Sequence, residues 1–308
     1  MAPLDLTRRT LLQAGVASAA TMLLPMGIIK ANALAIGDAV LTSVSDGNLV
    51  LPLDFSYPDV SQDELKALLE ANGLPTDGLL PDCNVPILKS GDRTIIFDVG
   101  SGANFMPSAG RLLDNMDAAG FDPAEITDVV FTHCHPDHLW GLIDDFDEIV
   151  FPNARFHMGR AEWEFWRDPG TVDAMPEARK TFAVGAQNRL VYLEDMINLF
   201  EPGAEVLPGV EAVDTAGHTP GHMSFMLHGG SDPVLIAGDA VTHFAISFTH
   251  PAWPTGSDQD TEMGIATRLR LLDRLAADKA VLAAYHLPKP GEGRVERDGT
   301  AYRFVAEG

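Results

Sequence analysis

The sequence is poor in cysteine and in positive charge, and each shortage excludes a class of protein. Cys83 and Cys134 are the only cysteines in 308 residues, so the chain cannot rely on a framework of several disulfides. Aspartate and glutamate total 44 against 21 lysine and arginine residues, which gives a net charge of −23 at pH 7. Because so acidic a surface repels phosphate backbones and anionic membranes, we expect no nucleic acid partner.

Several short motifs of catalysis and binding are also missing. There is no Gly-x-Ser-x-Gly nucleophile elbow, no glycine-rich phosphate loop and no Cys-x-x-Cys pair. No fixed-period repeat is visible, and no linker rich in proline, glycine or serine divides the chain after residue 35. We therefore expect one domain over residues 36–308 whose chemistry does not depend on a nucleophilic side chain.

Long apolar runs are absent except at the N-terminus, where the order of residues is that of a secretory signal. Arg8 and Arg9 precede an almost uncharged stretch over 10–29, and small residues follow over 31–35. A basic start, an apolar middle and a small-residue end are typical of signal peptides. The paired arginines resemble the bacterial twin-arginine export signal.

We predict that residues 1–35 are removed, with cleavage after Ala33 or Ala35. An uncleaved membrane anchor is the alternative, but Gly15 and Pro25 make the apolar run a weak spanning helix. The mature protein would be periplasmic or secreted, without a stable membrane anchor.

The spacing of apolar residues predicts an α+β fold. Strands are expected over 39–45, 85–89, 94–98, 126–131, 206–214, 222–227, 234–237 and 280–285, with a closing hairpin over 294–305. Helices are expected from the Ser61 capping box to Gly73 and over 109–119, 161–166, 178–200 and 260–277. Two sheets packed face to face with helices outside fit this order.

Residues 133–138 read His-Cys-His-Pro-Asp-His, a dense group of residue types that bind metals. His133 and His135 face the same side if the segment is extended, and the proline then turns the chain toward Asp137 and His138. Imidazole and carboxylate groups suit zinc and similar divalent ions. The segment therefore predicts a metal site.

Cys134 points away from its histidine neighbours in an extended segment, so we expect a buried free thiol. A role as a metal ligand and a disulfide with Cys83 are the alternatives. Export to an oxidising compartment would permit that disulfide.

Three more donors stand at the ends of later apolar runs. His218 lies in the segment 214–222, Asp239 follows the run 234–238, and His286 follows the run 281–285. With the four donors of residues 133–138 they make seven, too many for one tetrahedral ion. They suffice for two ions that share one carboxylate and leave positions open for water.

The complete pattern resembles the metallo-β-lactamase superfamily, whose signature is a His-x-His-x-Asp-His loop followed by later His, Asp and His ligands. The resemblance covers essentially the whole chain after residue 35. It implies a four-layer αββα sandwich that holds two divalent ions, above all zinc. By this resemblance the first ion is bound by His133, His135 and His218, the second by Asp137, His138 and His286, and both by Asp239. Asp137 and Asp239 are the residues that it makes catalytic.

Two supporting residues follow from the same resemblance. Asp98 resembles the aspartate that braces the ligand loop in this superfamily. His222 is a second candidate for such support, with a purely structural role as its alternative.

Further features are similar to the methyl parathion hydrolase branch: the export signal, the segment 217–222, the closing segment 302–305 and Phe165-Trp166. By that similarity Phe105 and Trp166 would line the substrate pocket, with core packing as the alternative. Phe244, in a segment expected beside the site, is a third pocket candidate.

The resemblance implies an enzyme that hydrolyses a neutral small-molecule ester with a hydroxide held between two metal ions. Organophosphate triesters and lactones are the leading substrates, and an N-acyl-homoserine lactonase is the main alternative. A β-lactamase, a glutathione thioesterase and a mononuclear iron sulfur dioxygenase are further alternatives from the same superfamily. A non-catalytic metal-binding protein is the alternative outside enzymes, and a homodimer is compatible with each of these.

Overall fold

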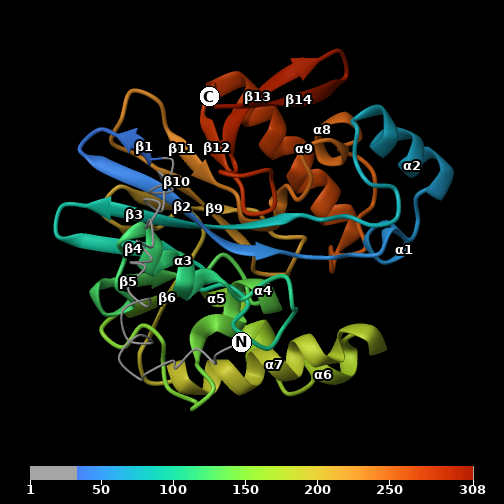
Figure 1. The fold of residues 1–308 in the computed structure, drawn as a ribbon. Coiled ribbons are helices and arrows are strands. Elements are labelled where there is room, and N and C mark those ends of the chain that lie inside the picture. Colours follow the sequence, from blue (N-terminus) through green and yellow to red (C-terminus); the bar gives the residue numbers. More distant parts are fainter. Residues whose placement is uncertain (1–32, 308) are drawn as a thin grey trace, which may run out of the picture.

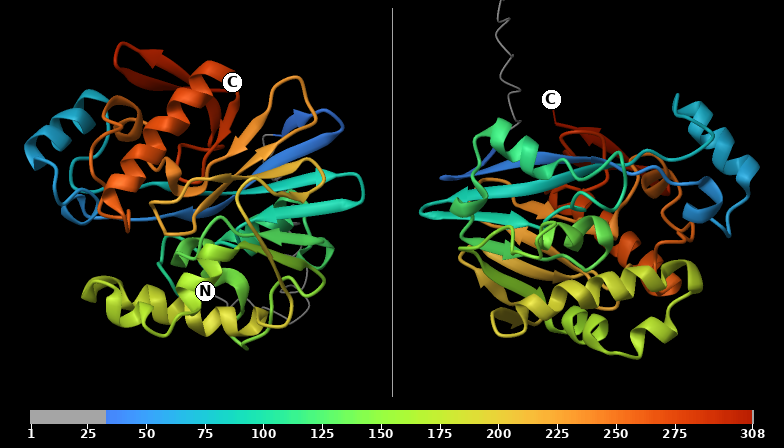
Figure 2. Two further views of the ribbon diagram at one scale, coloured as in Figure 1. Left: turned by 180° about the vertical axis from the view of Figure 1, so that it is seen from behind. Right: turned by 60° about the horizontal axis from the view of Figure 1, so that its bottom comes forward.

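Two β-sheets pack face to face in the structure, a computed structural model that describes residues 33–307 (Figure 1). The first sheet has seven strands in chain order, β1 to β7, and the second has seven in the order β14-β13-β12-β11-β10-β9-β8. Helices cover the outer face of each sheet, as the two further views show (Figure 2). The predicted α+β fold, an αββα sandwich, is confirmed. Most of the predicted signal, residues 1–32, lies outside the described residues.

The strands of the first sheet are β1 (Ala33–Ile36), β2 (Ala39–Asn48), β3 (Asp82–Ser90), β4 (Arg93–Phe97), β5 (Asp128–Val130), β6 (Arg155–Gly159) and β7 (Ile197–Phe200). Those of the second are β8 (Glu205–Leu207), β9 (Val210–Asp214), β10 (Met223–Leu227), β11 (Val234–Ile236), β12 (Val281–Ala283), β13 (Glu292–Asp298) and β14 (Ala301–Ala306). The helices are α1 (Leu53–Ser56), α2 (Gln62–Ala71), α3 (Leu112–Ala119), α4 (Pro136–Leu139), α5 (Arg160–Arg167), α6 (Thr171–Ala174), α7 (Lys180–Leu190), α8 (Ile246–Thr249) and α9 (Thr261–Asp278).

Three apolar layers stabilise the sandwich. Between the sheets, Phe97 of β4 and Phe225 of β10 pack with ring centroids 5.5 Å apart. A second layer joins the first sheet to α3, α5 and α7 and contains the fully buried Trp166. A third joins the second sheet to α8 and α9 through residues such as Leu272. Burial of apolar area on both faces of both sheets is the main favourable term in folding.

The helix ends follow local chemistry that is visible in the sequence. The Ser61 side chain accepts a hydrogen bond from the backbone N–H of Glu64, which begins α2 as predicted. The Asp260 side chain does the same for the N–H of Met263 at the start of α9. Gly120 adopts a φ of 79° and ends α3, a conformation that costs glycine little.

Two predicted elements differ from the structure. The helix expected over 178–200 ends with α7 at Leu190, and β7 follows as a parallel partner of β6. Apolar spacing alone does not separate a short strand from helix, and the free edge of β6 decides the conformation here. The strand expected over 206–214 is a hairpin of β8 and β9, because Gly209 turns the chain with a φ of 78°.

Parallel pairing brings the ends of several strands to one edge of the sandwich. β11 and β12 run parallel with Ile236 opposite Ala283, so Asp239 and His286 each lie three residues past paired positions. β4 and β5 are likewise parallel, with Phe97 opposite Val130, which places the next residue, Asp98, beside the start of the ligand segment. Among residues 33–307, none of the helices combines the length and the apolarity needed to cross a bilayer.

Candidate metal centre

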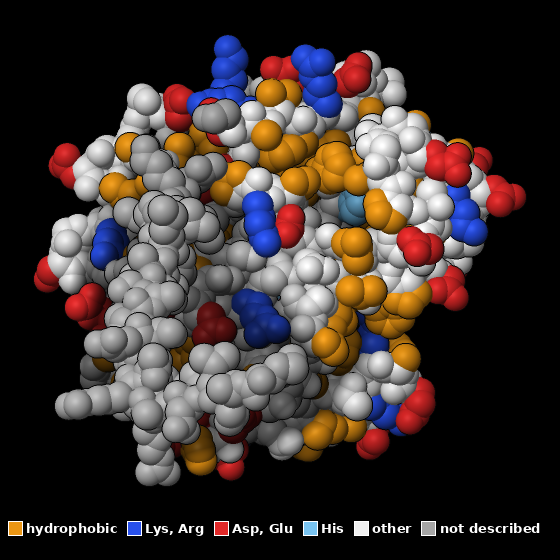
Figure 3. All heavy atoms as spheres, viewed as in Figure 1, with side chains coloured by type: hydrophobic (Ala, Val, Ile, Leu, Met, Phe, Trp, Pro, Cys, Tyr) orange, Lys and Arg blue, Asp and Glu red, His pale blue; other side chains and the backbone are white. Residues whose placement is uncertain are grey.

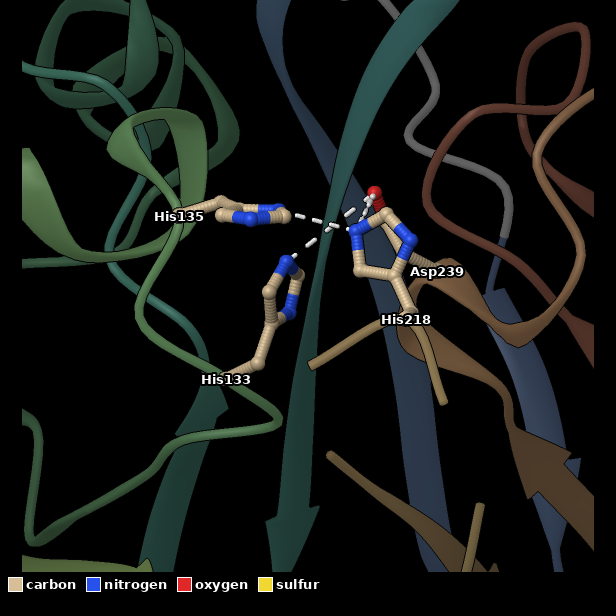
Figure 4. A group of neighbouring side chains, drawn as sticks. All are labelled: His133, His135, His218 and Asp239. Atoms are coloured by element: carbon tan, nitrogen blue, oxygen red, sulfur yellow. Dashed lines mark hydrogen bonds and ion pairs between the residues drawn. The ribbon is translucent and has the colours of Figure 1, made fainter. Parts of the chain in front are cut away.

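The structure brings all seven predicted donors into one buried site at the edge of the sandwich. One group consists of His133, His135, His218 and Asp239, whose ligand atoms lie within 4.8 Å of one another. Figure 4 shows the imidazoles of His133 and His135, which share one segment, and that of His218, from another segment, gathered beside the Asp239 carboxylate. His138 and His286 form a second group with the same aspartate. Asp137 Oδ2 completes it, 3.2 Å from Nε2 of His286.

The Asp239 carboxylate lies between the two groups. Its Oδ2 is 3.3 Å from Nε2 of His218, 4.0 Å from Nε2 of His133 and 3.2 Å from Nε2 of His286. Its Oδ1 is 3.1 Å from Nε2 of His138. A carboxylate that faces imidazoles of both groups has the position of a bridging ligand.

Hydrogen bonds at Nδ1 orient the histidine rings so that Nε2 faces the site. Nδ1 of His138 lies 2.7 Å from Asp98 Oδ2, and Nδ1 of His286 lies 2.8 Å from the carbonyl oxygen of Asp82. Because carboxylate and carbonyl oxygens only accept, each Nδ1 carries the proton. In the neutral rings, Nε2 is left as a lone pair that points into the site.

The same tautomer follows for the first group. The Thr132 hydroxyl donates to Asp98 Oδ2 at 2.7 Å, so its oxygen accepts from Nδ1 of His133 at 3.0 Å. Nδ1 of His218 lies 3.2 Å from Asp258 Oδ1. His133 and His218 therefore also present Nε2 lone pairs. Nδ1 of His135 faces Nε2 of His218 at 2.8 Å.

These lone pairs provide a test of whether a cation fits. Within residues 33–307, buried atoms without a hydrogen bond partner include Nε2 of His133, His135 and His138, Oδ2 of Asp137 and Oδ1 of Asp239. Buried hydrogen bond acceptors that face one another repel, and this arrangement costs free energy unless a positive charge lies between them. The donor set of five imidazoles and two carboxylates is the chemistry that zinc-like divalent ions take. The residues fit the predicted ions.

Burial and nearby carboxylates shift the pKa values of the buried histidines in opposite directions. Burial lowers the pKa of both His133 and His135 well below the usual value. Burial acts likewise on His138, but the carboxylates of Asp239, Asp137 and Asp98 outweigh it and raise that pKa well above its usual value. Carboxylates also outweigh burial at His218 of the first group and raise its pKa, so a divalent cation competes with protons in both groups.

The two predicted supporting residues lie directly behind the donors. Asp98 accepts from the backbone N–H and the hydroxyl of Thr132, each at 2.7 Å, and contacts His138. His222 accepts the backbone N–H of Asp239 at Nε2 (3.0 Å), and its Nδ1 lies 2.8 Å from the Thr215 hydroxyl. Asp98 thus orients His138 directly and His133 through Thr132, and His222 orients the loop that carries Asp239.

Asp258 is a supporting residue that no pattern in the sequence indicates. Its carboxylate contacts His218 through one oxygen and accepts from Arg268 at 2.8 Å through the other. Arg268 also donates to the backbone carbonyls of Pro251 and Trp253. Asp258 stands among solvated acidic residues in the sequence, so only the tertiary contact reveals its role.

A cavity of about 100 Å³ opens above the donors. His135, Asp137, His218, Asp239 and His286 form part of its wall. Apolar side chains supply much of the remainder, among them Leu49, Leu51, Phe55, Leu79, Phe105 and Phe182. Figure 3 shows hydrophobic side chains gathered on the face between α1 and α7, with a histidine visible among them.

The three predicted pocket residues have different positions. Phe105 lines the cavity, with its ring 6.4 Å from that of Phe182. Trp166 does not: it is fully buried, and its indole N–H donates to Glu162. Phe244 lines a neighbouring depression beside His286 rather than this cavity. Phe182 also lines the cavity, but the sequence does not distinguish it, because a phenylalanine in a helical pattern is typical of core packing.

Both cysteines are buried and free, so the expected free thiol at Cys134 is confirmed. Cys134 packs in the layer beneath the first sheet, with its sulfur 3.6 Å from that of Met158. Cys83 lies in the same layer, and its thiol is near Asp137 and His286. Burial raises the pKa of the Cys83 thiol to about 11, which keeps it protonated at neutral pH.

Residues 80–286 match the Metallo-beta-lactamase superfamily. The protein belongs to this superfamily. The N-acyl homoserine lactonase of Bacillus sp. is 26% identical over 188 residues, which cover 59% of this chain and 64% of that relative. The N-acyl homoserine lactonase AttM of Agrobacterium fabrum is 32% identical over 138 residues, 42% of this chain and 46% of the relative. The chain thus spans less than two thirds of the length of these curated relatives.

Two solved structures resemble this superfamily member over more of its length. AidC, described as a dizinc quorum-quenching lactonase in complex with a product, has a TM-score of 0.85 and 26% sequence identity. The hydrolase AbOPH of the beta lactamase superfamily has a TM-score of 0.84 and 26% identity. Each comparison covers 90% of this chain and 97% of the other.

Zinc is expected to stabilise the folded protein, because the lone-pair donors repel one another without a cation. At a free zinc concentration about 100 times the Kd, the stabilisation is about 2.7 kcal/mol, which raises Tm by roughly 5–10 °C for a domain of this size. The Asp239→Asn variant removes the shared charge and should show a clearly smaller rise. His228→Gln, which changes an exposed histidine paired with Glu211, serves as the control and should respond like the unaltered protein. Equal rises in all three proteins would contradict the site.

Proposed function

We propose that this protein is a two-metal hydrolase, with zinc as the metal, that opens the ring of N-acyl-homoserine lactones. One observation carries the proposal: seven donors from four separate segments converge around the Asp239 carboxylate beneath an apolar cavity. The lactonases among the relatives and AidC support this choice of substrate.

The chain's own residues supply position and charge for the reaction. Bound divalent ions would lower the pKa of a coordinated water and polarise a carbonyl oxygen. Asp239, placed between the two groups, would set the separation of the ions. Asp137 lies beside His138 and His286, and its backbone carbonyl accepts from the Tyr285 hydroxyl at 2.7 Å. That contact holds the ligand turn on the strand end that carries His286.

The cavity supports a neutral substrate with an apolar part. Its volume of about 100 Å³ suits a small ring directly over the donors. Phe105 and Phe182 stand on the wall, and the ring of Phe182 is 5.8 Å from that of His135. An acyl chain that follows these side chains toward solvent would bury apolar area and gain affinity.

Neutral phosphotriesters are the second candidate substrates, because the Arg179 guanidinium on the cavity wall is already engaged. Arg179 donates to the backbone carbonyls of Gly256 and Ser257, and it stacks over Phe55 with its guanidinium carbon 5.2 Å from the ring centroid. A cation held in this way is poorly placed to pair with an anionic substrate, so the cavity favours uncharged esters.

A hydrolysis panel on zinc-loaded protein tests both candidates. We expect turnover of N-acyl-homoserine lactones above that of p-nitrophenyl phosphotriesters, and none of a cephalosporin. His135→Ala and Asp239→Asn should each lower kcat by at least about 1000-fold, since each removes a donor on which the reaction depends. His228→Gln should keep full activity. Lactone turnover that survives either substitution would refute the site. Faster turnover of phosphotriesters than of lactones would make phosphotriesters the leading candidate substrates.

We also propose that the enzyme is exported by the twin-arginine route and cleaved after Ala33. Cleavage there keeps Leu34 to Ile36, which pair with Leu41 to Ala39 in the hairpin of β1 and β2, and Ile36 is buried. N-terminal sequencing of protein from the periplasm or medium should therefore begin at Leu34. Replacement of Arg8 and Arg9 by lysine should leave the precursor in the cytoplasm. Export of that variant at the normal rate would count against the twin-arginine route.

A further inference from the structure

Glu162 is a buried carboxylate to which the proposed reaction gives no role. It lies in the first turn of α5, and its exposed fraction is 0%. Two residues further along the same helix, Glu164 is exposed in the ordinary way. Because burial of a carboxylate is costly unless its lone pairs are satisfied, the contacts of Glu162 carry information about its role.

Four donors surround this carboxylate. Oε1 accepts from the backbone N–H of Cys134 at 2.8 Å and from the indole N–H of Trp166 at 2.6 Å. Oε2 accepts from the hydroxyl of Thr219 at 2.7 Å and from the backbone N–H of Gly221 at 3.1 Å. A protonated carboxyl would have to give up one of these bonds, so the contacts fit the ionised form. Burial acts in the other direction and raises the pKa of Glu162.

Three of the four donors come from the two segments that supply the imidazoles of the first group, and the fourth, Trp166, lies on α5 itself. Cys134 stands between His133 and His135, and Thr219 follows His218 directly. Glu162 therefore joins both segments through a single side chain. The backbones also approach closely at this point, since a Cβ on Gly221 would lie 2.0 Å from the backbone nitrogen of Glu162.

The second group is held in place by other residues. His138 is oriented by Asp98, and His286 by the carbonyl oxygen of Asp82. Those contacts involve neither α5 nor the segment around Thr219. A change at Glu162 should consequently act on one group of donors and leave the other as it is.

We propose that Glu162 is a positioning residue for the first metal ion, because it fixes the separation of the segment around Cys134 and the segment around Thr219. At that separation the imidazoles of His133, His135 and His218 can meet on one ion. This role rests on the two-metal site of the proposed function. It also explains why a carboxylate, which can accept four hydrogen bonds at once, is buried beneath the ligand loops.

Glu162→Gln tests the role with almost no change in shape. Its amide oxygen still accepts two hydrogen bonds, but its NH₂ group meets donors where the second oxygen stood. Titration of zinc-loaded protein with a chromophoric chelator measures the release of each ion. We expect one ion to be bound about 10–100-fold more weakly, in line with other losses behind metal ligands, while the other ion is bound as before. The control Glu164→Gln should release both ions like the unaltered protein.

Other outcomes separate this role from a general structural one. If Glu162→Gln lowers Tm but binds both ions with unchanged affinity, the proposed role is overturned. If that variant fails to fold, Thr219→Val provides the test. Loss of this one donor should weaken the binding of the same single ion several-fold, and unchanged affinities would overturn the proposal. If the unaltered protein and Glu164→Gln do not hold two zinc ions, the proposed function itself fails, and that result is distinct from the other two.

Discussion

Repulsion among the buried lone pairs around Asp239 is the constraint on which the rest of this structure depends. Two carboxylates and five imidazoles lie buried together at one edge of the sandwich. Such a set is tolerable only where positive charge compensates it and where each donor is held from behind. Asp98, His222, Asp258 and Glu162 provide that support, and all four are buried. Their hydrogen bonds link segments that are far apart in the chain, so fold and site are stabilised together.

Much of the site could be predicted because its donors follow strand ends, and strand ends are readable from apolar runs. Residues 133–138 are recognisable because metal-binding residue types are dense there. Asp239 and His286 follow short buried strands that pair in parallel. The order of strands and helices fitted two sheets packed face to face with helices outside, and the resemblance to the superfamily implied the four-layer αββα sandwich. Parallel pairing then determines which strand ends are neighbours, and that step needed the resemblance to the superfamily.

What escaped prediction depends on tertiary contacts with no local signal. Glu162 and Asp258 look like ordinary acidic residues of a solvated surface in a chain with a net charge of −23. Their burial is decided by which segments pack against α5 and by the position of Arg268. Trp166 was expected on the pocket wall, with core packing as the alternative, and the structure shows the alternative. Its indole N–H donates to Glu162 behind the metal donors. Strand β7 was predicted as helix, because the sequence does not show that this segment pairs with the edge of β6.

The central claim is that these side chains hold two ions that share Asp239, and anomalous diffraction tests it most directly. Crystals grown with zinc would be measured on both sides of the zinc absorption edge. The account predicts two anomalous peaks, one among His133, His135 and His218 and one among Asp137, His138 and His286, with the Asp239 carboxylate between them. A single peak, or peaks away from Asp239, would contradict it.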